Sequence, residues 1–261
     1  MSWLQALILG IIQGLTEYLP VSSSGHLEIA AVIFGRDALP EESMWFTVLL
    51  HAATALSTVV VYRKRIAEIF AGLFSRNKEQ WNFSMLIVLS MIPAAAVGLF
   101  FEDVIDNLFV GNLLLVGIAL VVTAFLLYFA DVYTAKKEPV KVNSALWMGI
   151  AQAIAILPGI SRSGATIATG ILCKTDKSKA AEFSFLMVIP LILGKMAKDL
   201  IDAPTTINTE TSVLALGFLA AFISGIFACT AMIKLVKASS LKYFSIYCLL
   251  AATGCIIYYF S

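Results

Sequence analysis

Six long apolar stretches dominate this sequence. Each holds about 20 residues, the length at which an α-helix crosses the hydrocarbon core of a bilayer. Hydrophobic residues form 60% of the chain and charged residues 13%, whereas soluble domains average about 45–50% and about 25%. We therefore predict an all-α, polytopic membrane helix bundle, with residues 1–261 forming a single membrane domain. The expected spans are residues 44–62, 83–101, 112–132, 183–201, 212–236 and 243–260.

Two further apolar stretches, residues 1–34 and 143–173, are interrupted by Leu19-Pro20 and Leu157-Pro158. Proline ends a helix because it lacks an N–H group and its ring clashes with the preceding turn. The pieces on either side are too short to span a bilayer, so we predict two re-entrant helix hairpins. Irregular backbone at membrane depth is tolerated only where it is buried in protein or lines a cavity. The two tips are therefore candidate functional sites.

The two broken stretches also resemble each other, and each is followed by three predicted spans. A hairpin plus three spans crosses the membrane an odd number of times, so the second half enters from the opposite side. This predicts two inverted-topology repeats, residues 1–132 and 143–261, whose breaks meet near the middle of the bilayer. A shift of 139 residues superimposes Gln13 on Gln152, Ser22 on Ser161, Ser24 on Ser163 and Gly25 on Gly164.

The basic residues are distributed unevenly over the two predicted sides of the membrane. Of the 18 Lys and Arg residues, 14 fall on the side opposite the N-terminus. Cytoplasmic loops of membrane proteins carry such an excess, so we expect that side to be cytoplasmic and both termini to be outside. These basic residues are Arg63, Lys64, Arg65, Arg76, Lys78, Lys136, Lys137, Lys141, Lys174, Lys177, Lys179, Lys234, Lys237 and Lys242.

Serine clusters at both tips predict an anion site. Serine is a favoured N-cap, and helix N-termini present free N–H groups and a positive dipole end to a ligand. Arg162, flanked by serines and glycines, would act as a phosphate clamp; the alternative is a snorkelling arginine. The candidate substrate-binding residues are Ser22, Ser24, Gly25, Ser161, Ser163, Gly164 and Thr166.

Further side chains near the first tip can carry chemistry. Gln13 and Glu17 lie four residues apart on one helical face, where they could orient a water or bind a hard cation through oxygen; Glu17 could instead be wetted at the interface. Ser23 and His26 lie three residues apart, which lets the histidine act as base or acid toward the serine. The alternative is a capping serine and a packing histidine. For His51, inside a span, both a cavity-lining position and ordinary packing remain open.

Two signatures resemble a known family. Gln13-x-x-x-Glu17 with Pro20-Val21-Ser22-Ser23-Ser24-Gly25-His26 is similar to the first signature of the bacterial undecaprenyl pyrophosphate phosphatases, also called BacA proteins. Pro158-Gly159-Ile160-Ser161-Arg162-Ser163-Gly164-Ala165-Thr166 is similar to their second signature. The resemblance extends over nearly the whole chain and implies an inverted-repeat bundle with two re-entrant hairpins.

The resemblance also implies residue roles. Glu17, Ser23, His26 and Arg162 match the positions thought to act in catalysis in this family. Arg162 would hold the diphosphate, and Ser23 would be nucleophile or phosphate ligand with His26 assisting it. Glu17, with Gln13 beside it, would bind a divalent cation, Mg²⁺ or Ca²⁺, or Glu17 would act in proton transfer. Some members have glutamate at the position of Gln13, so a mechanism with two carboxylates does not carry over to this chain.

The implied function is hydrolysis of undecaprenyl diphosphate to undecaprenyl phosphate and inorganic phosphate. That reaction recycles the carrier lipid for cell-wall synthesis and gives bacitracin resistance. We expect the protein in the bacterial plasma membrane, with its active site on the outer face and the polyprenyl tail of the substrate in the bilayer.

The competing hypothesis is a transporter or flippase for a phosphorylated polyprenyl lipid, because inverted repeats with broken helices are a transporter design. Transport requires no nucleophile or proton-transfer group, so Ser23, His26 and Glu17 favour the enzyme. The chain has no P-loop signature, and we expect neither a nucleotide ligand nor a nucleic-acid partner. Monomer and homodimer both remain open.

Overall fold

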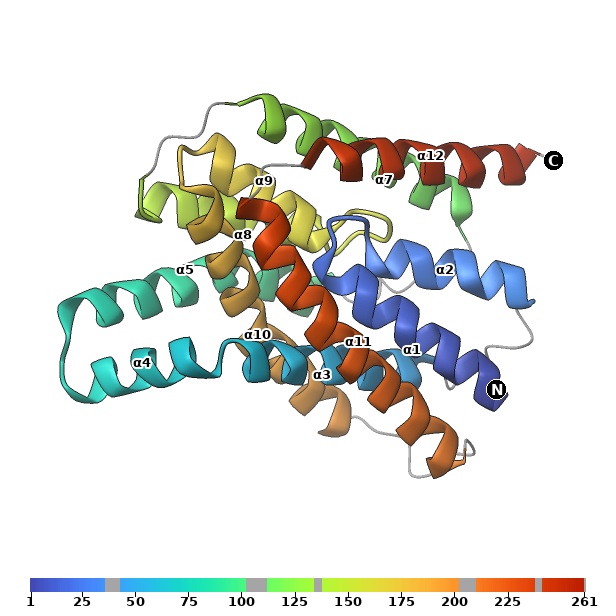
Figure 1. Ribbon diagram of the computed structural model, residues 1–261, viewed down its shortest axis with the longest axis horizontal. Helices are drawn as coiled ribbons and strands as arrows, with labels where there is room; N and C mark the ends of the chain where they lie inside the picture. Colours follow the sequence, from blue (N-terminus) through green and yellow to red (C-terminus); the bar gives the residue numbers. More distant parts are fainter. Residues whose placement is uncertain (36–42, 102–111, 134–137, 202–209, 238–240, 261) are drawn as a thin grey trace.

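The computed structural model describes residues 1–35, 43–101, 112–133, 138–201, 210–237 and 241–260. Within these ranges the chain forms eleven helices (Figure 1) and no strand beyond one isolated bridge between Glu138 and Thr175. The all-α prediction is confirmed. Lys136 and Lys137, which entered the topology argument, lie outside the described residues.

Each of the six predicted spans corresponds to a helix. Five helices are long and apolar enough to cross a membrane, and α3 (Ser43–Val61) makes a sixth if it is counted with the helix that follows it after a 74° bend. The chain is therefore a polytopic membrane protein, as predicted. The five are α5 (Lys78–Phe100), α7 (Leu113–Val132), α10 (Lys177–Ile201), α11 (Thr211–Lys237) and α12 (Leu241–Phe260).

Helix α4 (Arg63–Phe74) was not predicted, because its basic residues suggested a cytoplasmic loop. It runs beside the first part of α5, and this part of the two helices projects from the bundle (Figure 1). Arg65 fixes its position: Nε donates to Glu182 Oε1 of α10 at 2.7 Å, and Nη1 donates to Gln80 Oε1 of α5 at 3.0 Å. The guanidinium also lies 4.9 Å from the ring centroid of Phe83. One side chain thus joins three helices.

The two broken stretches fold as helical hairpins, as predicted. The first consists of α1 (Trp3–Tyr18) and α2 (Ser23–Phe34), and the second of α8 (Val142–Ile154) and α9 (Arg162–Leu172). At 1.5 Å per residue these helices are about 16–24 Å long, shorter than the roughly 30 Å hydrocarbon core. The two partners of each hairpin pack on each other, and the two tips lie side by side in the middle of the molecule (Figure 1).

The two halves pack on each other symmetrically: a helix of one half contacts a helix of the other, and the helices in the same places of the opposite halves make the same contact. Helix α1 packs on α11, and α8 packs on α5; α3 contacts α10, and α7 contacts α12. A two-fold relation between residues 1–132 and 143–261 would produce this pairing. The inverted relation itself stays a prediction.

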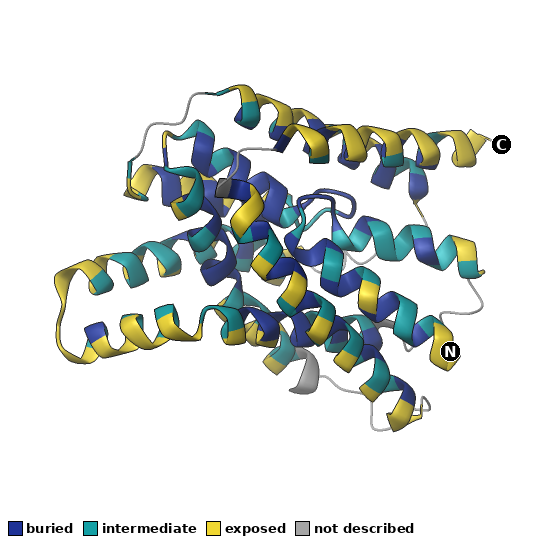
Figure 2. Ribbon diagram, viewed as in Figure 1, coloured by how far each residue is buried: buried dark blue, intermediate teal, exposed yellow. Residues whose placement is uncertain are grey.

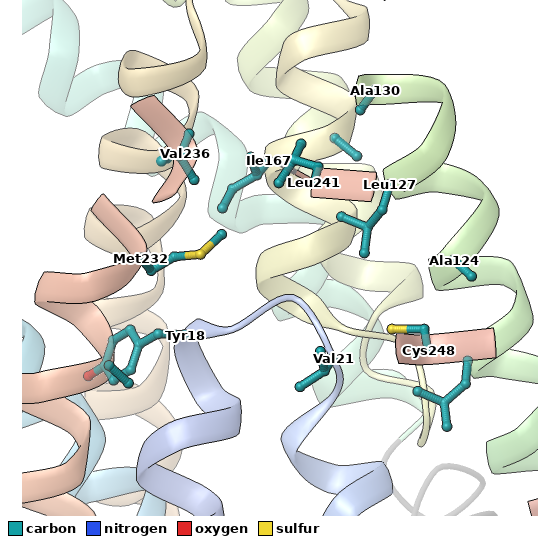
Figure 3. Close-up of a cluster of buried hydrophobic side chains, with 14 of the residues drawn as sticks. Tyr18, Val21, Ala124, Leu127, Ala130, Ile167, Met232, Val236, Leu241 and Cys248 are labelled. Carbon is teal, nitrogen blue, oxygen red and sulfur yellow. The ribbon is translucent and has the colours of Figure 1, made fainter. Parts of the chain in front are cut away.

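A buried apolar cluster surrounds the first tip. Tyr18 and Val21 flank the turn, and side chains from α7, α9, α11 and α12 close around them (Figure 3), together with side chains from α10. The Sγ of Cys248 donates to the carbonyl of Pro20 at 3.5 Å. By contrast, the outer faces of α7 and α12 are largely exposed (Figure 2), and they carry apolar residues such as Phe129 and Leu250. Such faces suit contact with lipid. The surrounding members of the cluster include Leu127, Met232, Val236, Leu241 and Cys248.

Gly159, in the second tip, should tolerate no side chain. Its φ is +91°, and an added Cβ would lie 2.8 Å from the Cα and carbonyl oxygen of Val116. Left-handed backbone costs about 1–2 kcal/mol and overpacking about 1–3 kcal/mol. We therefore expect Gly159→Ala to lower the free energy of unfolding by about 2–5 kcal/mol, measured by thermal unfolding in detergent. Gly98→Ala is the control, because no atom lies within 4 Å of the added Cβ. Equal unfolding midpoints for the two variants would contradict this prediction.

Candidate active site

A buried ion pair joins the two hairpin tips. Arg162, the first residue of α9, donates through Nη2 to Oε1 of Glu17 in the last turn of α1, 145 residues away in sequence. The side chain of Glu17 is 6% exposed and that of Arg162 is 17% exposed. Removing one partner of such a pair leaves a poorly solvated charge. The pair therefore holds the two tips together.

The second carboxylate oxygen of Glu17 collects further polar groups. Oε2 accepts a hydrogen bond from Ser23 Oγ at 2.7 Å and another from Gln13 Nε2 at 2.9 Å. His51 Nδ1, from α3, lies 3.0 Å from Gln13 Nε2 and 3.5 Å from Glu17 Oε2. Charge-assisted hydrogen bonds to both oxygens stabilise the ionised carboxylate. Three of the predicted site residues, Gln13, Glu17 and Ser23, thus meet Arg162 at one point.

Both helices that begin at the tips are capped by serine. Ser22 Oγ accepts from Gly25 N at 3.2 Å, and Ser161 Oγ accepts from Gly164 N at 3.1 Å. The positive dipole ends of α2 and α9 both lie at the tips, which is an arrangement that favours an anion. Ser22 has φ of 71°, an unfavourable value for a residue with a Cβ. Backbone strain of this kind occurs often at functional sites.

The other tip hydroxyls connect one tip to the other. Gly159 N donates to Ser24 Oγ at 3.4 Å, and Ser163 Oγ donates to the carbonyl of Leu19 at 3.4 Å. Both contacts cross from one hairpin to the other, so these serines fix the separation of the two helix N-termini.

Thr166 lies behind Arg162. Its hydroxyl donates to the carbonyl of Arg162 at 2.8 Å and lies 2.6 Å from Ser184 Oγ of α10. On the opposite side, Ser161 N donates to Thr123 Oγ1 of α7 at 3.1 Å. These contacts attach the second tip to the neighbouring helices. None of them places Thr166 against Glu17, so its position is that of a support for Arg162.

His26 is held away from Ser23. Its Nδ1 lies 2.8 Å from the carbonyl of Ser22, and its Nε2 lies 2.7 Å from the hydroxyl of Tyr247 in α12. The rings of His26 and Tyr247 stack with centroids 5.6 Å apart. Because a carbonyl only accepts, Nδ1 carries the hydrogen and neutral Nε2 accepts from Tyr247. The hydrogen bond that Ser23 makes goes instead to Glu17.

Several buried polar atoms at the tips lack a hydrogen-bond partner in the part of the chain that the structure describes. They include Gln13 Oε1, an acceptor, and Arg162 Nη1, a donor. Leaving such a group unpaired costs about 1–3 kcal/mol. Both side chains also contact Glu17, so the free donor and the free acceptor belong to one constellation. A ligand that carries anionic oxygens together with a cation would satisfy both. Both side-chain polar atoms of Gln152 in α8 are likewise buried and unpaired.

The residues present suit a cation shared with a ligand. Over the described ranges, no group of three or more His, Cys, Asp or Glu side chains could hold a metal ion. Glu17 and the free Oε1 of Gln13 are the two hard oxygen donors. Mg²⁺ commonly binds one or two protein oxygens and takes its other ligands from water and substrate phosphates. The donor set fits that type of site.

Two residues of this region were not selected from the sequence. For His51 the sequence left a cavity-lining position and ordinary packing open, and Tyr247 was not among the candidate residues. The sequence feature that could have identified His51 is its place within a membrane span, where polar side chains often have a functional role. Tyr247 offered no signal, because aromatic residues are common in membrane helices.

Comparisons with known proteins agree on one family. The model of the family described as "Bacitracin resistance protein BacA" matches residues 6–254. A protein of Christiangramia forsetii named undecaprenyl-diphosphatase is 54% identical over 258 residues, 98% of each chain. Proteins of the same name from Bacteroides thetaiotaomicron and Parabacteroides distasonis are 48% and 49% identical, covering 98% and 96% of this chain and 99% and 96% of their own.

The Glu17–Arg162 pair should show strong coupling in stability. Glu17→Gln or Arg162→Met leaves an uncompensated buried charge, so we expect each single variant to lower the free energy of unfolding by about 3–5 kcal/mol. The double variant removes both charges and should lose clearly less than the sum. Thermal unfolding of all four proteins in detergent completes the double-mutant cycle.

Glu138→Gln provides the control for this cycle, because Glu138 pairs at 2.6 Å with the exposed Lys141 and such pairs contribute about 0–1 kcal/mol. Additive losses in the Glu17 and Arg162 variants would show that the pair is not coupled.

Proposed function

The chain belongs to the bacitracin resistance protein BacA family, and we propose that it is an undecaprenyl-diphosphatase. It would convert undecaprenyl diphosphate and water to undecaprenyl phosphate and inorganic phosphate. The observation that supports this most strongly is the Glu17 carboxylate, which contacts the Ser23 hydroxyl on one oxygen and Arg162 on the other. An anion clamp beside a hydroxyl on a carboxylate is what phosphoryl transfer to serine requires. Transport would not need that hydroxyl.

In this proposal Arg162 binds the diphosphate. Nη2 stays with Glu17, and the unpaired Nη1 donates to a phosphate oxygen. The N-termini of α2 and α9 add N–H groups on the same side, and the serines and glycines of both tips line the anion site. These groups are fixed before the substrate arrives, so they stabilise charge on the transferring phosphoryl group without rearranging.

Ser23 is the proposed nucleophile. Its Oγ would form a bond to the terminal phosphorus while the bond from that phosphorus to the bridging oxygen breaks, and undecaprenyl phosphate would leave with the bridging oxygen. Glu17, 2.7 Å from Oγ, would take the serine proton. Water would then hydrolyse the phosphoserine, releasing inorganic phosphate and restoring Ser23. His26, hydrogen-bonded to Tyr247, would assist from the α12 side.

A divalent cation, Mg²⁺ or Ca²⁺, would be held by Glu17 and Gln13 Oε1 together with the diphosphate. Bound there, it would neutralise part of the charge that develops on the phosphate oxygens. The chain itself would supply two hard oxygen donors to the cation, the Glu17 carboxylate and Gln13 Oε1.

We place the protein in the bacterial inner membrane as two inverted repeats, with both termini and the site open to the outer face. The symmetric contacts of the two halves and the excess of basic residues on one predicted side of the membrane support this proposal. The polyprenyl tail would remain in lipid, next to the exposed apolar faces of the helices.

The first test is phosphate release from undecaprenyl diphosphate by purified protein, with Mg²⁺, Ca²⁺ or neither. We expect release by the wild type in the presence of a cation and a fall of at least about 100-fold for Arg162→Ala, because the developing charge loses its clamp. Ser23→Ala should abolish turnover. Arg63→Ala is the control and should retain activity, since Arg63 donates to the carbonyl of Val60 at an exposed position outside the proposed site.

Residual turnover by a folded Ser23→Ala protein would make Ser23 a phosphate ligand and not the nucleophile. Absence of release from folded wild type with any cation would overturn the phosphatase proposal.

Membrane topology can be tested with reporter fusions. We expect a C-terminal alkaline phosphatase fusion to be active in bacteria and a C-terminal green fluorescent protein fusion to be dark, because the C-terminus would lie outside. Fusions truncated after Lys237, on the predicted cytoplasmic side, should give the opposite pattern. Fluorescence from the full-length C-terminal fusion would reverse the proposed orientation.

A further inference from the structure

His51 is a polar residue within a membrane-spanning helix, and the mechanism above does not use it. It lies in α3, and its side chain is 32% exposed. Its Nδ1 lies 3.0 Å from Gln13 Nε2 and 3.5 Å from Glu17 Oε2. A histidine thus contacts the one neutral side chain among the proposed cation ligands.

The hydrogen-bond partners determine the orientation of the Gln13 amide. Nε2 lies between two atoms, Glu17 Oε2 at 2.9 Å and His51 Nδ1 at 3.0 Å. A carboxylate only accepts hydrogen bonds, so the amide must present its NH₂ group to Glu17. If the amide were rotated by 180°, its oxygen would face the carboxylate and two acceptors would repel each other.

The same geometry determines the tautomer of His51. The NH₂ group of Gln13 donates to Nδ1, so Nδ1 must be the ring nitrogen without a hydrogen, and Nε2 carries it. With both hydrogens of the amide engaged, the amide plane and therefore the direction of Oε1 are fixed. That oxygen is buried and has no partner in the described part of the chain. It is a hard acceptor held in a fixed direction.

We propose that His51 is a positioning residue: by accepting from the Gln13 amide, it holds Gln13 Oε1 toward the cation that accompanies the diphosphate. The inference rests on the proposed function. Without His51, the amide retains only the hydrogen bond to Glu17 and can rotate, so the carbonyl is no longer fixed. His51 acts through Gln13 and not through contact with the reacting atoms.

The test separates the acceptor atom from the bulk of the side chain. His51→Leu removes the acceptor, whereas His51→Asn retains one, because asparagine Oδ1 occupies nearly the place of histidine Nδ1. Thr54→Val is the matched control on the same helix, since the Thr54 hydroxyl donates to the helix carbonyls of Leu50 and His51. The readout is binding of Mn²⁺ in the presence of methylenediphosphonate, a diphosphate that is not hydrolysed, measured by calorimetry in detergent.

We expect His51→Leu to weaken Mn²⁺ binding about 5–30-fold, the effect of losing one buried hydrogen bond of about 1–2 kcal/mol. His51→Asn should restore binding to within about threefold of the wild type, and Thr54→Val should match it. Gln13→Ala should weaken binding as His51→Leu does, and the double variant should bind no more weakly than Gln13→Ala alone, because both changes remove one function. If His51→Leu does not fold, judged by thermal unfolding, His51→Ala replaces it.

Three results would overturn the proposal: wild-type affinity in His51→Leu, equal weakening in His51→Asn and His51→Leu, or additive losses in the double variant. So would a wild type that binds no Mn²⁺ with the diphosphate. Phosphate release, measured in parallel, distinguishes this from the proposed function. Wild type that binds Mn²⁺ but releases no phosphate contradicts the phosphatase and leaves the role of His51 supported. Normal release with unchanged binding in His51→Leu contradicts the role of His51 alone.

Discussion

The buried ion pair between Glu17 and Arg162 is the interaction on which the rest of the structure depends. The hairpins that carry these residues are separately too short to cross a bilayer, and each alone would leave a charge without a partner. Because a lone buried charge is strongly unfavourable, the tips are stable only side by side. Ser23 and Gln13 reach the same carboxylate from within the first hairpin, and the pairing adds Arg162 and the N-terminus of α9 to them. The candidate active site is thus a direct consequence of the pairing.

The helices of the fold were largely predictable because bilayer thickness and proline act locally. A span needs about 20 apolar residues, and Pro20 and Pro158 interrupt such stretches in the same way. Helix α4 was missed for a complementary reason. Its charged residues are typical of a loop, and its position depends on contacts of Arg65 with Glu182 and Gln80, which lie 117 and 15 residues away in sequence. No local pattern contains that information.

The residues that lie at the candidate site were easier to predict from the sequence than the hydrogen bonds that they make with one another. Serine clusters, an arginine and a carboxylate at helix breaks indicated side chains that the structure brings together, but their spacing also allowed His26 to act on Ser23. In the structure the carbonyl of Ser22, one turn before His26, accepts from the ring, and Tyr247, 221 residues away, occupies the other ring nitrogen. Ser23 instead reaches Glu17, six residues back across the turn. Sequence spacing alone could not distinguish a His26 that acts on Ser23 from a His26 that packs elsewhere. Contacts with residues distant in sequence determine which occurs.

The amide at position 13 is consistent with the charge balance of the tips. Glu17 and Arg162 together carry no net charge, and a second carboxylate at position 13 would place an uncompensated negative charge next to Glu17 in a poorly solvated region. Gln13 avoids this by donating to Glu17 while keeping a neutral carbonyl free. A cation could therefore enter together with the negative charge of a diphosphate, without first having to neutralise the protein. The unpaired donor of Arg162 would bind the anion of the same complex, so one ligand would satisfy these two unpaired groups of the tips.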